Sequence, residues 1–161
     1  MSIVISFVAL ALSLSVFLHG RWRDRRDLIL RIHEHLITAD QQRGRRLLYA
    51  MTETRVRVED LSEDDYVSIN NALASLNVLG IYYQRRYVRR KDALELWGLP
   101  VVRALLAGDT FIAHRDAEQG MNSWPQLRAF AEDARKYAQR QGVTVQVSGG
   151  IAGKLRPPVE G

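Results

Sequence analysis

Residues 3–18 read IVISFVALALSLSVFL, and the next eight, residues 19–26, read HGRWRDRR. The first segment contains no charged residue, and its only polar side chains are three serines, whose hydroxyl groups can bond to backbone carbonyls within a helix. As a helix with Ser2 and His19 at its ends, it is about 26 Å long, close to the roughly 30 Å hydrocarbon core of a bilayer. We therefore expect residues 1–20 to form a transmembrane anchor.

Three other interpretations of this segment compete with the anchor. A cleaved signal peptide requires a basic residue before the apolar run and a small-residue cleavage site after it, and neither is present. An interfacial helix requires a polar face, whereas residues 3–18 are apolar on all sides. A buried core helix stays open as an alternative, because sixteen residues is also an ordinary helix length in a soluble domain.

The flanking residues predict the orientation of the anchor. No basic side chain precedes it, whereas four arginines follow it at once: Arg21, Arg23, Arg25 and Arg26. Because such clusters stay on the cytoplasmic side, we expect an N-terminus outside the cell and a C-terminal domain in the cytoplasm, at the inner (plasma) membrane. Each arginine near an anionic lipid surface contributes about 1 kcal/mol of attraction, so these four are candidate lipid contacts.

The remaining residues suffice for one domain, which we place at residues 21–142. The chain has no cysteine, so it has neither a disulfide framework nor thiolate chemistry. Its formal net charge of +5 arises from 23 basic residues, nearly all of them arginine, against 18 acidic ones. A surface of this kind suits an anionic partner such as lipid headgroups, nucleic acid or an acidic protein.

Apolar residues at helical spacing recur through this domain, and no pair of strands can be recognised. The sequence therefore predicts an all-α fold, with the anchor followed by a small bundle of about five helices. The first of these, from Asp24, has no stop signal separating it from the anchor. The segments with a helical pattern are 24–40, 41–58, 63–83, 93–107, 110–118 and 124–141.

Several residues predict where these helices begin, bend or end. Ser62 and Ser123 are expected N-caps, Asp92 is a third, and Gly120 and Gly142 are expected stops. Gly44 is expected to mark a kink within 41–58. Pro100 is expected to kink 93–107 or to divide it near Gly98, because proline lacks an N–H and clashes with the preceding turn. Residues 143–147 alternate like a strand without a partner, and 143–161 are expected to form a disordered tail rich in Gly and Pro.

A second basic cluster lies between the third and fourth segments of the domain. It interleaves tyrosines with five basic residues: Arg85, Arg86, Arg89, Arg90 and Lys91. Such a segment can stack bases and pair phosphates of nucleic acid, or it can fold back onto anionic lipid. The third interpretation is a solvated helix end, where cations favour the negative end of the helix dipole. The sequence leaves these three alternatives open.

No motif in the chain points to catalysis. His33 and His35 lie two residues apart, a spacing that places them on different sides of a helix, and no third metal ligand follows at helical spacing. The acidic residues between 53 and 65 do not match a calcium-binding loop. The sequence has no nucleophile elbow and no phosphate-binding glycine loop. We therefore expect neither an enzyme nor a bound metal or cofactor.

The order of these features resembles a family of uncharacterised bacterial proteins with one N-terminal span and a small helical cytosolic part. The features that carry the resemblance are the anchor with its arginines, the acid-led helix 63–83, the basic segment 85–91, and the helices containing Trp97 and Trp124. The resemblance implies no catalytic residue. Together with the absence of a chemical motif, it favours a tether, scaffold or regulatory interaction module, with the membrane and either protein partners or further copies of the chain as its contacts. Binding of anionic lipid or nucleic acid is the alternative.

Overall fold

The computed structural model describes residues 2–143, except for the side chains of residues 2–5, 11, 22 and 25. Within this part of the chain the fold is all-α, as predicted, and contains no strand. The elements, in order, are α1 (Ser2–Leu36), α2 (Ala39–Thr54), the short 3-10 helix η1 (Val58–Asp60), α3 (Glu63–Gln84), α4 (Arg90–Ala107), α5 (Asp109–Gln119) and α6 (Pro125–Arg140).

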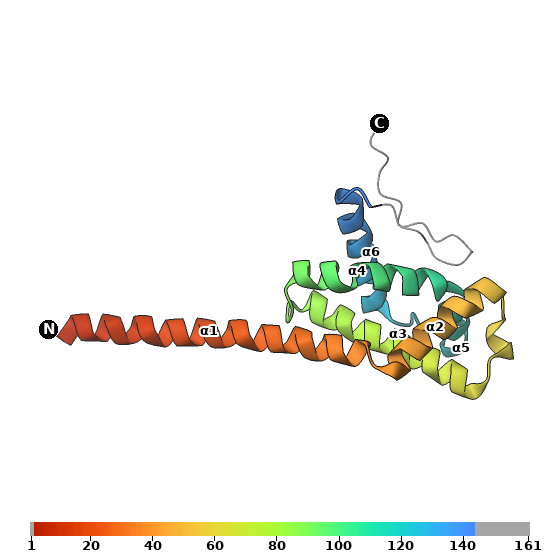
Figure 1. The fold of residues 1–161 in the computed structure, drawn as a ribbon, viewed down its shortest axis with the longest axis horizontal. Coiled ribbons are helices and arrows are strands. Elements are labelled where there is room, and N and C mark those ends of the chain that lie inside the picture. Colours follow the sequence, from red (N-terminus) through yellow and green to blue (C-terminus); the bar gives the residue numbers. More distant parts are fainter. Residues whose placement is uncertain (1, 144–161) are drawn as a thin grey trace.

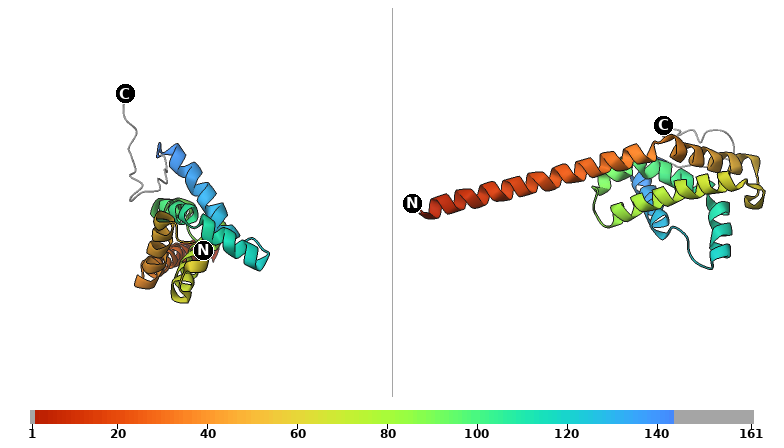
Figure 2. Two further views of the ribbon diagram at one scale, coloured as in Figure 1. Left: turned by 90° about the vertical axis from the view of Figure 1, so that its right-hand side faces the viewer. Right: turned by 90° about the horizontal axis from the view of Figure 1, so that it is seen from below.

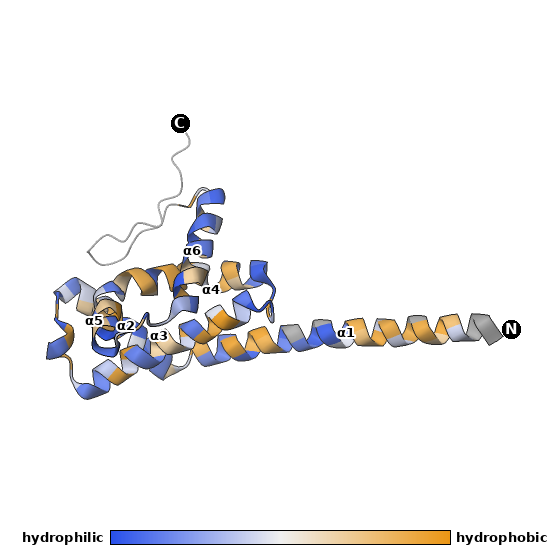
Figure 3. Ribbon diagram, turned by 180° about the vertical axis from the view of Figure 1, so that it is seen from behind, coloured by the Kyte–Doolittle hydropathy of each residue, from blue (hydrophilic) through white to orange (hydrophobic). Residues whose placement is uncertain are grey.

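Helix α1 is one uninterrupted helix of 35 residues, so the apolar segment and the first helix of the domain are continuous. At about 1.5 Å per residue it is about 52 Å long. Its N-terminal half extends away from the bundle (Figures 1 and 2), and this half is the most continuously hydrophobic stretch on the ribbon (Figure 3). Its C-terminal half packs on the bundle through Leu36, which is 1% exposed, and through the partly buried Leu28, Ile29 and Ile32.

Helix α3 is the centre of the bundle and packs against α2 and α6. Its start is the predicted one, because the Ser62 hydroxyl accepts a hydrogen bond from the Asp65 N–H at 3.2 Å. Three acidic residues in the first turn face the positive end of the helix dipole. Ile69, Leu73 and Leu76 are fully buried and form the middle of the core.

The prediction that Gly44 marks a kink is wrong. Helix α2 runs through Gly44 without a break, and the chain turns instead at residues 37–38, before the helix begins. Gly44 is buried where α2 crosses α3, and a Cβ atom there would collide with the Ser68 carbonyl and lie 2.8 Å from the Ala72 Cβ. The glycine therefore serves close packing of two helices. Helix α2 also ends at Thr54, four residues before the predicted end.

The expected division at Pro100 is also wrong, because α4 is a single helix from Arg90 to Ala107. Pro100 offers no N–H to the carbonyl of Leu96, but Leu96 is 50% exposed on the outer side of the helix. Val101, Val102 and Ala104 on the inner side are buried. Packing on both sides of the proline thus outweighs one lost hydrogen bond. The N-cap is Arg89 rather than the expected Asp92, which lies in the first turn.

Gly120 ends α5 and Gly142 follows α6, both at positive φ, as predicted. Ser123, however, is not the N-cap of α6. Trp124 takes that place in a left-handed conformation, at φ 52°, and no side chain caps the helix. The Ser123 N–H instead donates to the Asp116 carboxylate at 2.6 Å, and Arg128 binds the same carboxylate at 2.7 Å. These contacts hold the loop between α5 and α6.

Among the residues described with their side chains, which leave out residues 2–5 and 11 of α1, no single helix is both long enough and apolar enough to cross a membrane. Helices α4 and α5 meet these criteria only as a pair, with a bend of 65° between them. The predicted strand-like segment and tail lie outside the described residues, except for Val143.

Candidate functional site

The apolar half of α1 has no packing partner within the described part of the chain. Phe7 is 70% exposed, Val16 is 73% exposed and Leu18 is 57% exposed. The other large apolar side chains described between them are exposed as well, namely Val8, Leu10, Leu12, Leu14 and Phe17. Eight exposed large apolar side chains distributed around one helix form a surface that water solvates poorly.

The turn that joins α3 to α4 is a helix stop with an unusual residue. The Arg86 N–H donates to the Tyr83 carbonyl at 3.2 Å, and the Tyr87 N–H donates to the Tyr82 carbonyl at 3.0 Å. This pair of bonds, with the Tyr82 and Tyr87 rings in contact at 5.9 Å between centroids, is a Schellman motif. Glycine usually occupies the left-handed position of this motif, but here it is Arg86, at φ 58°. A non-glycine residue there costs roughly 1–2 kcal/mol.

The two basic clusters of the sequence meet at one place. A hollow of about 360 Å³ is lined by Arg21, Asp24 and Leu28 of α1 and by Arg85, Arg86 and Tyr87 of the turn. These six residues are here called the basic basin. The α3–α4 turn lies at the end of the bundle from which the apolar half of α1 projects (Figure 1). The basin is therefore located where the apolar helix enters the domain.

The basin has an excess of positive charge. Its lining includes three arginines and one carboxylate, Asp24, so the formal charge of the basin is +2. Among the described side chains, none of these four charged groups forms an ion pair. Arg21 lies over the Phe17 ring at 5.9 Å, which orients its side chain along α1. The arrangement leaves hydrogen-bond donors of the guanidinium groups available to an anion.

The other predicted basic residues are not brought into the basin. Arg90 lies over the Tyr83 ring at 5.1 Å, and Lys91 forms an ion pair with Glu95 at 3.7 Å. Arg89 is the N-cap residue of α4. Arg23 and Arg26 are exposed on α1, outside the basin, and the Arg25 side chain lies outside the described residues. The sequence thus identifies the two clusters, and the structure divides them into basin residues and residues around it.

Tyr83 connects the turn to α6. Its ring is buried and stacks on Phe130 at 4.5 Å between centroids, and its hydroxyl donates to the Asp133 carboxylate at 3.0 Å. Burial and this hydrogen bond to Asp133 raise the pKa of Tyr83 to about 12. The contact fixes the last turn of α3, and therefore the position of Arg85 and Arg86, relative to the bundle.

His33 and His35 point to different partners, as their spacing predicts. The His33 ring contacts the Trp97 ring at 5.5 Å between centroids, whereas His35 Nε2 lies 3.3 Å from the Ser75 hydroxyl. The Arg45 guanidinium also lies over the Trp97 ring, at 5.7 Å, and burial lowers its pKa. His33 Nδ1, Arg45 Nη1 and Trp97 Nε1 are buried and have no hydrogen-bond partner among the described residues. The contact region between α1, α2 and α4 therefore contains polar atoms whose hydrogen-bonding capacity is not met among the described residues.

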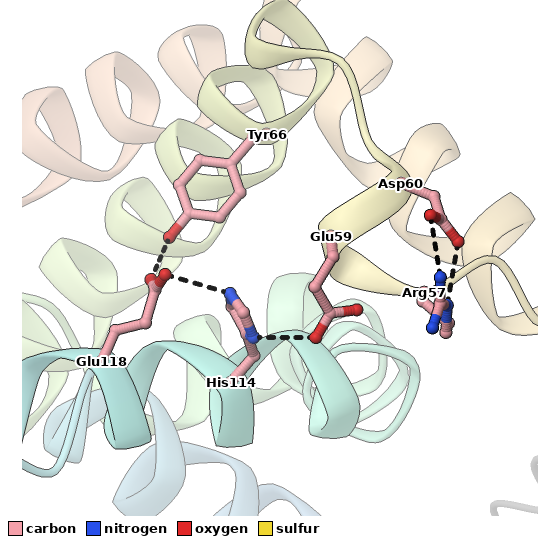
Figure 4. Close-up of polar contacts among 6 residues, drawn as sticks. All are labelled: Arg57, Glu59, Asp60, Tyr66, His114 and Glu118. Carbon is pink, nitrogen blue, oxygen red and sulfur yellow. Dashed lines mark hydrogen bonds and ion pairs between the residues drawn. The ribbon is translucent and has the colours of Figure 1, made fainter.

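A second polar group that the sequence does not predict involves His114 (Figure 4). His114 Nδ1 lies 3.5 Å from Glu59 in η1, and His114 Nε2 lies 3.2 Å from Glu118 in the same helix, α5. The Tyr66 hydroxyl of α3 donates to Glu118 at 3.4 Å. The i, i+4 spacing of His114 and Glu118 is the one signal in the sequence for this group. Among the described residues, no group of three or more His, Cys, Asp or Glu is placed to hold a metal ion. We interpret the contacts as a clasp between η1, α3 and α5.

One further hollow, of about 300 Å³, lies between α4 and α6. Most of its lining is apolar, including Leu94, Leu99, Val102, Ala138 and Val143. Glu95 and Tyr137 lie at the same hollow and are joined by a hydrogen bond of 3.1 Å. Its size and lining suit an apolar side chain of a binding partner.

Comparison of the chain with protein-family models, curated protein sequences and solved structures finds no match. The resemblance to a bacterial family stays a prediction.

Proposed function

We propose that this protein is a single-span membrane protein whose helical domain is held against an anionic lipid surface and acts there as a tether or interaction module. The apolar half of α1 forms the anchor, with its N-terminus outside the cell and the domain on the cytoplasmic side of the plasma membrane. The basic residues at the junction contact the lipid headgroups. The observation that most directly supports this proposal is that arginines from both basic clusters line one hollow where the apolar helix joins the domain.

The exposure of the apolar half of α1 supports the anchor. The large apolar side chains described between Phe7 and Leu18 are all exposed, so their burial needs another apolar phase. Burying apolar surface contributes about 25 cal/mol per Å², and a bilayer buries a helix on all sides at once. A second copy of the chain buries only one face of the helix.

The length of α1 supports contact between the basin and the lipid. Residues 2–18 span about 26 Å at 1.5 Å per residue, a few Å less than the hydrocarbon core. Because the apolar segment is shorter than the hydrocarbon core, the residues after Leu18 are drawn toward the lipid. Because α1 is continuous through Arg21 to Leu28, the basin moves toward the headgroups with it.

The packing of the tyrosines favours lipid over nucleic acid as the anionic partner. Stacking of bases requires exposed aromatic faces. Tyr83 is buried and Tyr82 is partly buried against Tyr87, so only Tyr87, which is 45% exposed, offers a base much of its surface. Pairing with phosphate groups requires only the guanidinium groups, which stay available in the basin. The hollow between α4 and α6 is the candidate contact for a protein partner of the tether.

Fractionation of lysed cells tests the anchor. The full-length chain is expected to sediment with membranes, to resist extraction with 1 M salt and alkaline carbonate (about pH 11), and to dissolve in detergent. Release by high salt alone would show that the chain is only electrostatically attached. A chain that stays in the supernatant without detergent would overturn the proposal.

A further inference from the structure

We propose that the basic basin is a binding site for one phosphomonoester group, supplied by a membrane lipid headgroup. The lipid source rests on the proposed membrane anchoring, whereas the phosphate chemistry rests on the basin alone. The proposal goes beyond a diffuse attraction of arginines to a charged surface, because it specifies one saturable site and one class of ligand.

The charge of the basin selects among phosphate groups. Arg21, Arg85 and Arg86 against Asp24 give a formal charge of +2. A phosphomonoester carries about −1.5 to −2 at pH 7, which nearly neutralises the site. A phosphodiester carries a single negative charge and leaves one positive charge uncompensated.

The donor geometry fits the same ligand. Each guanidinium group offers a planar pair of N–H donors that matches two phosphate oxygens. A phosphomonoester has three terminal oxygens, so three arginines from two elements can bind it from different sides. Tyr87 lines the same hollow and carries a hydroxyl group, which is a neutral donor.

The depth of the basin suits a lipid headgroup. Arg21 lies three residues after Leu18, which is about 4.5 Å along the helix. The headgroup layer on each side of a bilayer is about 5–8 Å thick. Arg21 therefore reaches the headgroup phosphates when Leu18 lies at the edge of the hydrocarbon core. The turn that carries Arg85 and Arg86 lies beside it.

The backbone of the turn supplies a matched pair of variants. Arg86 occupies the left-handed position where glycine is favoured, so Arg86→Gly keeps the turn and removes one guanidinium group. Arg85→Gln removes a second guanidinium group and puts an uncharged polar side chain in its place. Arg140→Gln, at the end of α6 and outside the basin, is the control for loss of one surface charge.

The test uses the full-length chain in neutral detergent, with native mass spectrometry of bound short-chain lipids. Dioctanoyl phosphatidic acid carries a phosphomonoester, and dioctanoyl phosphatidylglycerol carries a phosphodiester. We expect one saturable phosphatidic acid site, at least about tenfold tighter than for phosphatidylglycerol, because a hydrogen bond to a charged group is worth about tenfold or more. The double variant Arg85→Gln/Arg86→Gly is expected to lose this preference, and Arg140→Gln to keep it.

A soluble phosphomonoester, glycerol 3-phosphate, separates the two sources of the ligand. Binding of glycerol 3-phosphate as tight as that of phosphatidic acid would support the site and overturn the lipid as its source. Equal affinities for phosphatidic acid and phosphatidylglycerol, binding unchanged in the double variant, or tighter binding of a phosphodiester oligonucleotide would each overturn the proposal. Because these measurements need no bilayer, they stay interpretable if fractionation shows that α1 does not anchor the chain.

Discussion

Single residues at helix crossings decide how closely the bundle packs. Gly44 lies where α2 meets α3, and Gly80 lies where α3 meets α6, with a virtual Cβ only 2.5 Å from the Gln126 carbonyl. Backbone contact at these points leaves no room for a methyl group. Sequence patterns identify such glycines only as weak points in a helix, because the neighbour that requires them is distant in sequence.

Replacing Gly44 with alanine is expected to destabilise the protein. Alanine favours a helix by about 1 kcal/mol over glycine, but overpacking against Ser68 costs about 1–3 kcal/mol, and the obstacle here is backbone. Thermal unfolding of the full chain in detergent, followed by circular dichroism, measures the change. Gly20→Ala is the control, because nothing lies within 4 Å of its virtual Cβ. A melting temperature that rises with Gly44→Ala would contradict the packing described.

Replacing Arg86 with glycine is expected to stabilise the fold by about 1 kcal/mol, because glycine adopts the left-handed conformation without strain. The same unfolding measurement, made without anionic lipid, checks the change. A loss of stability would show that the Arg86 side chain holds the turn. In that case a binding defect of this variant would not report on the basin.

At the scale of elements, helix type and number follow from the sequence, whereas several local details do not. The Ser62 cap and the glycine stops were predictable because the bonds that make them are local. Ser123 fails as a cap because Trp124, 8% exposed, packs against Phe111 and the Arg115 guanidinium. Burial of an indole ring outweighs a cap worth about 1 kcal/mol. Pro100 is likewise retained in α4 by tertiary packing.

The candidate site is predictable only in part for the same reason. Both arginine clusters are visible in the sequence, but they are about 60 positions apart, and no local rule brings Arg21 to Arg85. Their meeting depends on the continuity of α1 and on where its C-terminal half packs. Leu36 and Ile32 set that packing through contacts with the core.

The contact between α3 and α6 predicts a response to alkaline pH. The Tyr83 phenol has a folded pKa of about 12 against an ordinary value of 10.0, so the folded state holds this proton more tightly than the unfolded state. The resulting stabilisation is complete below pH 10 and is lost as the pH rises toward 12. Tyr83→Phe, which removes the titrating hydroxyl, is expected to flatten the fall in melting temperature over this interval. An equally steep fall in Tyr83→Phe would show that other groups cause it.

At the scale of the whole molecule, an apolar, a basic and a mixed polar region follow one another along the long axis of the protein. One end is an exposed apolar helix, the junction is a basic basin, and the other end carries the clasp of α5 (Figures 1 and 3). Such a gradient from apolar to basic to mixed polar matches the order of layers at a membrane surface. Under the proposed anchoring, the domain would be held in one orientation, with the hollow between α4 and α6 accessible to a partner.

Depth measurement in bilayers tests this orientation most directly. The chain has no cysteine, so a single spin label can be introduced at Tyr87→Cys in the basin or at Met121→Cys, which follows α5 at the opposite end of the bundle. Relaxation by a nickel-chelating lipid is measured for each label in vesicles that contain anionic lipid. We expect strong relaxation at position 87 and weak relaxation at position 121. Equal relaxation at the two positions, or stronger relaxation at 121, would contradict it.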